Sequence, residues 1–545
     1  MNAVLFKTRS WGLWEVALIT ALALGFRLLH LEEMRHPDSY LHIMAAASLL
    51  TDGTLSLGGE VPYDRAYLFT YLVAAFQSVF GGTTFVAGLP AILAGVAWVA
   101  VLFVWVRSTA GRTAAWVAGL LFAFDVWSLA LAHMVRFYTL HGLVFFLGAI
   151  GLYYIVTRRP PWGTMAITAA AVIGAFGFAY HLQYTTVVGA IALSVWLVVE
   201  ISPRVCLYFR DHRSRAVALA IPIAVGGSVA AFLFFQSEAA ARYWGMFSTA
   251  APWAEPRVDD LTYYIRRLER RYGFLWALFP VAAIIAIARF GRPAVFSLVL
   301  FAVPLILHSL AAFKDARYLG YAIPFFFAIW GFAIAAVLPY LKIVAQRVVS
   351  KLGKSCIRGQ SLSFLTRFVL FAVLVGVALT GRSVWWEAYK FVVENERPSG
   401  MSHWRWDEAA IQLKPVIESV DVVVISGVVA SYYYMDHVHV IANTGDLSSD
   451  PEFSPRAGRG VPRISAPKSL EILMRCFPSG LVAVDEARWG GLGFSQEIIE
   501  VLQANAQPFP LPEEWRVHAY TWSHDVDVGE EVDCPVLEAH RAPRL

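Results

Sequence analysis

The chain has 545 residues, of which 58% are hydrophobic and 15% charged, and its mean hydropathy is +0.57. One soluble core cannot bury that much apolar surface, so the composition excludes an ordinary soluble protein and indicates a polytopic α-helical membrane protein. The formal net charge of +4 is too small to favour nucleic acid as a partner. Membrane lipids are therefore the first partner that the composition predicts.

A helix needs about 20 apolar residues to cross the hydrocarbon core of a membrane. The sequence contains about eleven stretches of this kind. We expect spans near residues 11–30, 85–106, 113–132, 138–157, 162–181, 184–201, 215–236, 273–290, 294–312, 318–341 and 364–383. Arg and Lys between these spans gather on one side of the pattern, which predicts a cytoplasmic N-terminus and a C-terminus on the outer side.

The first predicted span is followed by a long outward loop, residues 31–84, which contains Arg35-His36-Pro37-Asp38-Ser39-Tyr40-Leu41-His42. The Asp38 carboxylate, just outside the first span, is a candidate catalytic base. Residues 36–50 are typical of a short amphipathic helix at the membrane interface, and His42 falls on this helix. The loop therefore supplies the first candidate site.

The other outward turns also carry polar residues, and the predicted topology places them at the same membrane face. They are His133, Arg136, Glu238, Lys314, Arg317 and Tyr318. His141 follows Arg136 by five residues, near the start of the next predicted span. Cations beside a carboxylate suit an anionic phosphate together with a group that must lose a proton. For each cation, anchoring to a lipid headgroup is the alternative.

Asp125 falls inside the third predicted span, where an ionisable group usually faces a cavity or a partner. A second interpretation is that Asp125 marks the outer end of a short helix, and that the chain from there to Arg136 lies in the interface. The sequence leaves both open.

After Arg382 the composition becomes polar, and residues 386–545 are expected to form an α/β domain outside the membrane. The pattern predicts helices at 406–419 and 496–504 and strands at 421–427 and 481–485. A further strand is expected at 431–436, with three tyrosines that either pack in the sheet or stack on carbohydrate. Cys476 and Cys534 both fall in this domain, where either a disulfide or two free thiols are allowed.

Four separated motifs within residues 10–340 resemble the GT-C superfamily of membrane glycosyltransferases. The resemblance is to the protein O-mannosyltransferase and lipid A aminoarabinose transferase branch, of the glycosyltransferase family 39 type. The motifs are His36-Pro37-Asp38-Ser39-Tyr40, Tyr63-Asp64-Arg65-Ala66-Tyr67-Leu68, Ala132-His133-Met134-Val135-Arg136-Phe137-Tyr138-Thr139-Leu140-His141 and Lys314-Asp315-Ala316-Arg317-Tyr318-Leu319 with Pro324.

The resemblance implies an inverting transferase that moves a sugar from a polyprenyl-phosphate donor to a lipid, glycan or protein acceptor. It also implies a bacterial inner membrane location. It places Asp38 at the position of the catalytic base, and Arg136 and Arg317 at positions facing the donor phosphate. Lys314, His133, His141, Tyr318, Glu238 and His42 are expected near the same face. Residues 1–385 would form the catalytic membrane domain, and residues 386–545 are expected to take part in acceptor selection.

This chain lacks two acidic residues that the family usually has. The family's first-loop motif is often Asp-Glu, and here it is Asp38-Ser39. The family's second acidic residue, near the fourth span, is His141 in this chain. A hard divalent cation prefers several carboxylate oxygens, so no cofactor is certain. The spacing Asp38-x-Tyr40-x-His42 is similar to that of the metal-dependent oligosaccharyltransferases, which keeps a divalent metal open.

Two other classes of protein compete with an enzyme. A flippase or transporter would bind the same donor and move it without chemistry, and such proteins often place ionisable residues near the membrane midplane. Asp125 is the feature that favours this class. A membrane scaffold with an outer interaction domain would tolerate the loss of Asp38.

Overall fold

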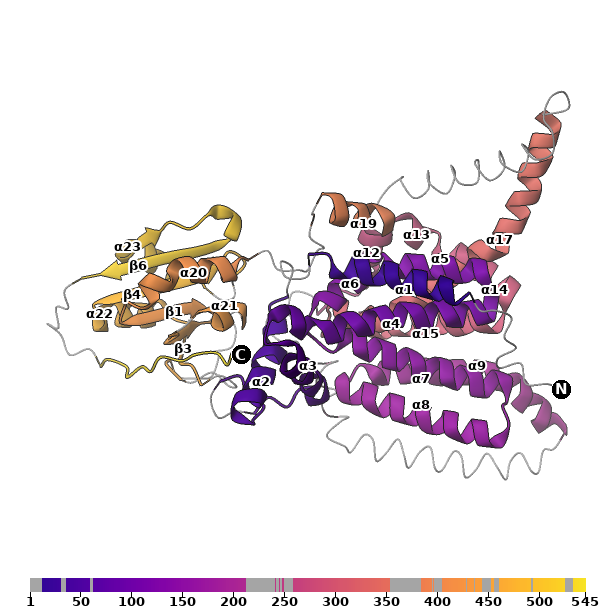
Figure 1. The fold of residues 1–545 in the computed structure, drawn as a ribbon, viewed down its shortest axis with the longest axis horizontal. Helices are drawn as coiled ribbons and strands as arrows, with labels where there is room; N and C mark the ends of the chain where they lie inside the picture. Colours follow the sequence, from indigo (N-terminus) through magenta and orange to yellow (C-terminus); the bar gives the residue numbers. More distant parts are fainter. Residues whose placement is uncertain are drawn as a thin grey trace. The chain divides into compact units, whose positions relative to one another are not determined.

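The protein is described from a computed structural model. The model describes residues 12–30, 36–58, 62–211, 258–352, 384–394, 404–427, 429–435, 437–443, 452–454, 460–491, 494–524 and 533–545, and positions 241, 245, 248 and 396. Two compact units make up the chain (Figure 1). The helical unit contains residues 1–29, 92–132 and 138–398, and the mixed unit contains residues 30–91, 133–137 and 399–545.

Long apolar helices build the helical unit, and α7 packs against α8, α5 against α17 and α9 against α15. Figure 1 shows α7 and α8 side by side. Its helices are α1 (Leu13–Leu28), α4 (Thr84–Ala110), α5 (Arg112–Ala123), α6 (Val126–His133), α7 (Tyr138–Arg158), α8 (Trp162–Leu182), α9 (Thr186–Asp211), α12 (Tyr263–Tyr272), α13 (Phe274–Ala277), α14 (Phe279–Phe290), α15 (Arg292–Leu310), α16 (Ala316–Leu319), η2 (Gly320–Ala322), α17 (Ile323–Leu352) and α19 (Val384–Val393). The first residues of α4 belong to the mixed unit.

Five helices in the described part of the chain are long and apolar enough to cross a membrane, and α5 with α6 would form a sixth, bent span. The five are Thr84–Ala110, Tyr138–Arg158, Trp162–Leu182, Arg292–Leu310 and Ala316–Tyr340. The predicted first span is a helix of 16 residues, and the apolar parts of α9 and α14 are also short. The predicted spans 215–236 and 364–383 lie outside the described residues.

The break between α5 and α6 bends this helix pair by 52° at Asp125. The buried Asp125 carboxylate accepts the backbone N–H groups of Trp127 (3.3 Å) and Ser128 (2.8 Å), and it caps α6 in this way. Arg27 donates from Nη1 to the carbonyl oxygen of Ala123, 2.9 Å away, at the end of α5. The structure therefore favours the second interpretation of Asp125, as the end of a short helix.

The mixed unit joins the first loop to an α/β domain. The loop provides α2 (Ser39–Asp52) and α3 (Tyr67–Phe80). The domain follows as α20 (Trp406–Ile417), β1 (Val422–Ser426), α21 (Val429–Tyr434), β2 (Val440–Ala442), β3 (Arg463–Ile464), α22 (Pro467–Cys476), β4 (Ser479–Asp485), α23 (Gln496–Asn505), β5 (Gln507–Phe509), η3 (Glu513–Trp515) and β6 (Val517–Ser523).

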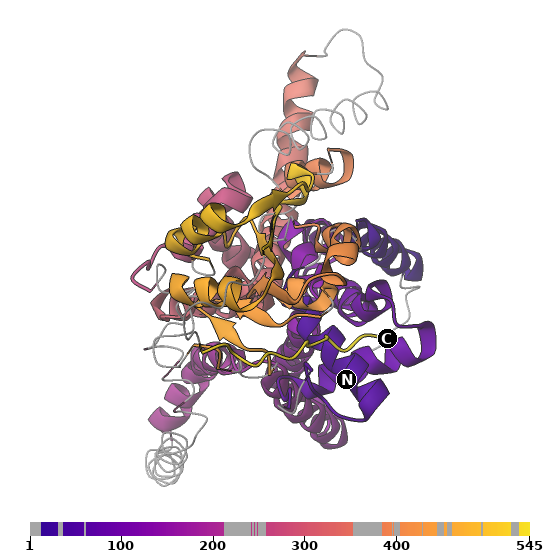
Figure 2. The same ribbon diagram turned by 90° about the vertical axis from the view of Figure 1, so that its left-hand side faces the viewer.

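The six strands form one sheet in the order β3-β2-β1-β4-β6-β5. Figure 2 shows the orange and yellow elements of this domain after a turn of 90°. Strands β1 to β4 are parallel to one another, and β6 runs antiparallel to both β4 and β5. All five residues of β1 are buried, and Val422 and Val424 join a core with α22 and α23. A continuous apolar run is typical of a parallel strand that is covered on both faces.

The predicted strands at 421–427 and 481–485 and the predicted helices at 406–419 and 496–504 are confirmed as β1, β4, α20 and α23. The strand expected at 431–436 is wrong, because residues 429–434 form α21 and Asp436 lies outside the described residues. Parallel neighbours such as β1 and β2 require a crossover connection, and a helix provides it.

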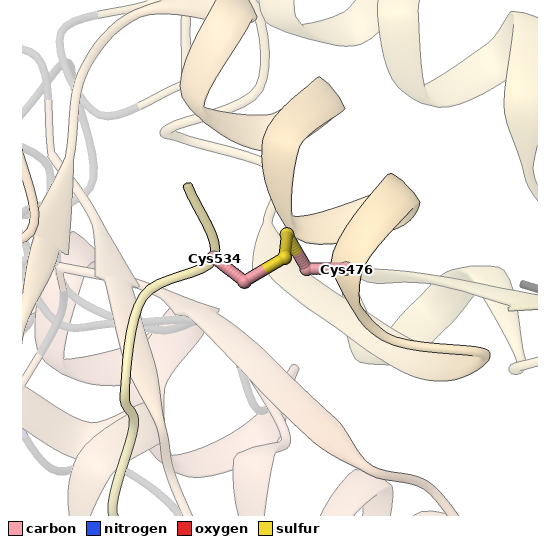
Figure 3. The surroundings of a disulfide bond; sticks show 2 residues. All are labelled: Cys476 and Cys534. Carbon is pink, nitrogen blue, oxygen red and sulfur yellow. A yellow bond between two sulfur atoms is a disulfide. The ribbon is translucent and has the colours of Figure 1, made fainter. Parts of the chain in front are cut away.

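A disulfide joins Cys476, at the end of α22, to Cys534, and the two Cα atoms are 5.6 Å apart (Figure 3). It closes a stretch of 58 residues and ties the C-terminal tail, residues 533–545, to the α/β domain. Of the two alternatives that the sequence left open, the structure has the disulfide.

Candidate functional site

Asp38 stands at the N-terminal end of α2 and leaves its carboxylate partly open to solvent. The backbone N–H of Asp38 donates to Nδ1 of His36 at 3.1 Å, and the same ring nitrogen is 4.0 Å from Oδ2 of Asp38. The Asp38 side chain is 30% exposed. The carboxylate is therefore accessible to solvent, while the backbone beneath it is held in place.

The segment 133–137 holds the start of α2 from the other side. The backbone N–H of Val135 donates to Oγ of Ser39 at 3.0 Å, and Nη1 of Arg136 donates to the carbonyl oxygen of Asp38 at 3.3 Å. Arg136 is only 1% exposed, and its guanidinium lies 5.3 Å from the centre of the Phe137 ring. The structure thus brings together two residues of the candidate site that are 98 positions apart.

His42, one turn further along α2, joins this helix to α3. Its Nδ1 is hydrogen-bonded to Oγ1 of Thr70 at 2.8 Å, and its Nε2 is 3.4 Å from the hydroxyl of Tyr63. The ring is fully buried, and this burial lowers its pKa well below the usual value, with help from the charges of Arg136 and Arg65. His42 is therefore a neutral structural group at neutral pH.

Arg65 is a residue of this cluster that the sequence analysis did not select. Its guanidinium lies 5.7 Å from the centre of the Phe137 ring, which Arg136 also contacts. The signal was present, since Arg65 falls within the second motif of the GT-C resemblance. His133, in contrast, is fully buried at the end of α6.

The helical unit holds a second cluster around Arg317. Oδ1 of Asp315 accepts the backbone N–H of Arg317 at 3.0 Å and lies 3.6 Å from its Nε. The Arg317 guanidinium is 5.8 Å from the centre of the Tyr138 ring and 5.6 Å from that of Tyr318. Its side chain is 13% exposed, so the cation is partly accessible between two aromatic rings.

Lys314 differs from Arg317 because its ammonium is bound within the protein. Nζ donates to the carbonyl oxygen of Val258 at 2.6 Å, and the residue is fully buried. Tyr264 of α12 donates to the carbonyl oxygen of Asp315 at 2.8 Å and holds the same turn. The sequence did not identify Tyr264, although α12 is an amphipathic helix between two predicted spans.

The remaining candidates are internal. His141 is buried on α7, with Nε2 2.9 Å from Oγ1 of Thr186 and its ring 5.5 Å from that of Tyr321. Tyr318 is buried against Arg317. Glu238 lies outside the described residues.

Among the described residues, no group of three or more His, Cys, Asp or Glu side chains is placed to hold a metal ion. Asp38 has one histidine beside it, and the nearby Arg136 is a cation. A hard divalent ion requires several oxygen ligands, so the described residues around Asp38 do not fit such an ion.

No protein-family model matches the chain, and no curated protein matches its sequence. Solved structures match its fold over most of its length. ArnT from Cupriavidus metallidurans bound to undecaprenyl phosphate is 15% identical, with 94% of this chain and 98% of that one covered and a TM-score of 0.60. The oligosaccharyltransferase AglB from Archaeoglobus fulgidus, in complex with an inhibitory peptide and a dolichol-phosphate, is 12% identical. The match covers 97% of this chain and 75% of AglB, with a TM-score of 0.57.

Likeness at this level of identity concerns the fold. It agrees with the apolar helices of the helical unit and with the sheet domain near the C-terminus. The chain therefore shares its overall fold with these two proteins.

Proposed function

We propose that this protein is an inverting glycosyltransferase that moves a sugar from a polyprenyl-phosphate donor to a lipid, polysaccharide or protein acceptor at the outer face of the membrane. The observation that carries the proposal is the partly exposed Asp38 carboxylate at the start of α2, where the buried Arg136 donates to the backbone carbonyl oxygen of Asp38. The polyprenyl phosphates bound to two proteins of the same fold support the donor class.

Asp38 acts as the general base in this proposal. Its carboxylate takes the proton of an acceptor hydroxyl while the hydroxyl oxygen attacks the anomeric carbon of the sugar. The bond from that carbon to the phosphate oxygen breaks on the opposite side, so the anomeric centre inverts and the phosphate leaves with the electron pair. The nucleophile comes from the acceptor, so no covalent enzyme intermediate is needed.

Cationic side chains stabilise the negative charge of the departing phosphate. Arg317 suits this role in the helical unit, because its guanidinium is partly exposed and fixed by Asp315. Arg136 contributes its charge beside Asp38 and also holds the backbone of the base. Lys314 is the weakest of the three candidates, because its ammonium already binds the carbonyl oxygen of Val258.

We further propose that the chain lies in a bacterial inner membrane with its N-terminus in the cytoplasm. Residues 1–385 then form the catalytic membrane domain, and residues 386–545 lie outside and take part in acceptor selection. The Cys476–Cys534 disulfide supports an outer location for this domain, because disulfides persist in oxidising compartments.

A transporter remains the competing proposal, and its main support in the sequence was Asp125. Tyr272 donates to Oδ1 of Asp125 at 3.0 Å, in addition to the two backbone donors of α6. These hydrogen bonds account for the buried carboxylate by local structure. The transferase is therefore the better supported of the two functions.

The test compares wild type with Asp38→Asn in purified form, using radiolabelled polyprenyl-phosphate sugars and an extract of membrane lipids and cell envelope as acceptor. The variant should lose transfer by a factor of about 10²–10⁴ and keep donor binding, because only proton removal is lost. The matched control is Asp52→Asn, an exposed carboxylate at the far end of α2, which should retain activity.

Unchanged transfer in Asp38→Asn would contradict the mechanism. Donor binding by both forms without transfer, together with movement of the donor across vesicle membranes, would establish the transporter instead.

A further inference from the structure

The α/β domain touches the base-bearing helix through α21. The hydroxyls of Tyr434 and Tyr40 are hydrogen-bonded at 3.0 Å, and the ring centres of the same pair are 5.3 Å apart. The ring centres of Tyr433 and Tyr40 are 4.8 Å apart. Tyr40 follows Asp38 by two residues, so this contact lies less than one helical turn from the proposed base.

The C-terminal tail reinforces α21 at the same place. The hydroxyl of Tyr432 donates to the carbonyl oxygen of Arg541 at 3.2 Å, and the Arg544 guanidinium lies 5.2 Å from the centre of the Tyr433 ring. Gly58 of the first loop has φ of +95°, and a Cβ there would come within 2.7 Å of the Tyr432 hydroxyl. First loop, α21 and tail are therefore in close contact within the mixed unit.

These tyrosines do not form an open surface for stacking on sugar. Tyr432 is fully buried, Tyr40 and Tyr433 are 5% and 8% exposed, and Tyr434 is partly buried. The hydroxyl pair of Tyr40 and Tyr434 fixes an orientation, because a hydrogen bond between phenols restricts both rings at once. Of the two roles that the sequence left open for this tyrosine run, packing fits the structure.

We propose that Tyr434 is a positioning residue for the base. Through its hydroxyl bond to Tyr40, the α/β domain fixes the first turn of α2 and with it the carboxylate of Asp38. Arg136 and Ser39 hold the same turn from the segment 133–137. The proposal rests on the proposed function of Asp38, but the mechanical part, that Tyr434 orders α2, can be tested without any activity.

The first measurement is hydrogen exchange of the full-length protein, read at the amides of residues 39–44. Tyr434→Phe and Tyr40→Phe each remove one hydroxyl and keep both rings, and each should speed exchange at these amides at least severalfold. The matched control is Tyr520→Phe, which removes a hydroxyl from β6 of the same domain, where the ring stacks on Trp489. Tyr520→Phe should leave exchange in α2 as it is in wild type. If Tyr434→Phe and Tyr40→Phe also exchange at the wild-type rate, or if all three variants speed exchange equally, the inference is wrong.

The second measurement is the steady-state transfer reaction. Each single variant should lower kcat about five- to tenfold and leave the KM for the donor unchanged, because misorientation of a base affects the chemical step. The double variant Tyr40→Phe/Tyr434→Phe should be no slower than either single variant, since both changes remove the same bond. Losses that multiply in the double variant, or an unchanged kcat, would overturn the role in positioning the base.

The two measurements separate this inference from the proposed function. If wild type transfers no sugar but exchange in α2 rises in Tyr434→Phe, the proposed function fails while the ordering of α2 by Tyr434 stands. If wild type is active and Asp38→Asn is not, the kinetic comparison decides the role of Tyr434 alone.

Discussion

At the scale of the residue, the first loop is organised by hydrogen bonds from the buried side chains of Arg136 and His42. Arg136 was expected to face the donor phosphate, and His42 was expected near the same face. The structure shows Arg136 on the backbone of Asp38 and His42 inside the loop, bonded to Thr70. A sequence motif marks such residues as important, but it does not distinguish a side chain that touches substrate from one that holds its neighbour.

The buried His42 should make the loop sensitive to acid. Its pKa is lowered in the folded state, so between that value and about 6.5 the unfolded chain binds a proton that the folded chain does not. Stability is therefore fully present above about pH 6.5 and falls as the pH drops below it, by at most about 1.4 kcal/mol per pH unit for one group.

We expect His42→Gln to reduce this acid sensitivity, although the variant starts from a lower stability at pH 7. Thermal unfolding in detergent at pH 7.5 and pH 5.5 gives the difference for each protein. Other histidines of the mixed unit whose pKa is lowered by partial burial, such as His439 and His518, contribute with the same sign in both proteins and cancel in the comparison. An equal loss in wild type and His42→Gln would contradict the prediction.

At the scale of the element, apolar runs predicted most of the helices, because a run of about 20 apolar residues has few other stable conformations in a membrane. The α5–α6 break was harder to see, since Asp125 interrupts an otherwise continuous run. The misread element is α21, where six residues are too few to distinguish the period of a helix from that of a strand. Its conformation follows from the crossover between β1 and β2, which is a tertiary requirement.

Asp125 gives a test at this scale. Asp125→Ala removes the cap of α6 and leaves the Tyr272 hydroxyl without this acceptor, so it should lower stability by about 2 kcal/mol. Asp125→Asn keeps an acceptor oxygen for the backbone and should cost less, although it loses the attraction to Arg27. Thermal unfolding of both variants in detergent measures the difference, and equal stability of Asp125→Ala and wild type would refute the capping role.

At the scale of the whole molecule, the mixed unit takes its residues from distant parts of the chain. The sequence predicted an outer domain and an outer loop as separate features, because nothing local marks a contact between Tyr40 and Tyr434, which are 394 positions apart. The order of motifs and their expected side of the membrane supported the GT-C resemblance. The tyrosine contact required the tertiary structure.

The disulfide should stabilise this unit by tying down its tail. Opening a closed stretch of 58 residues typically costs about 2–4 kcal/mol. We therefore expect Cys534→Ser to lower the unfolding temperature of the α/β domain and to expose residues 533–545 to hydrogen exchange. A reducing agent should have the same effect on wild type and none on Cys476→Ser/Cys534→Ser; resistance of wild type to the reductant would contradict the prediction.

The composition of the mixed unit also sets the order of events during biosynthesis. Residues 30–91 leave the ribosome early, but they complete their unit only with residues 399–545. At about 5–20 residues per second, the loop with Asp38 waits roughly 25–100 s for the last residues of the chain. A newly made molecule thus inserts its first helices long before the unit that holds Asp38 can form, and a ribosome that stalls within residues 399–545 leaves this unit incomplete.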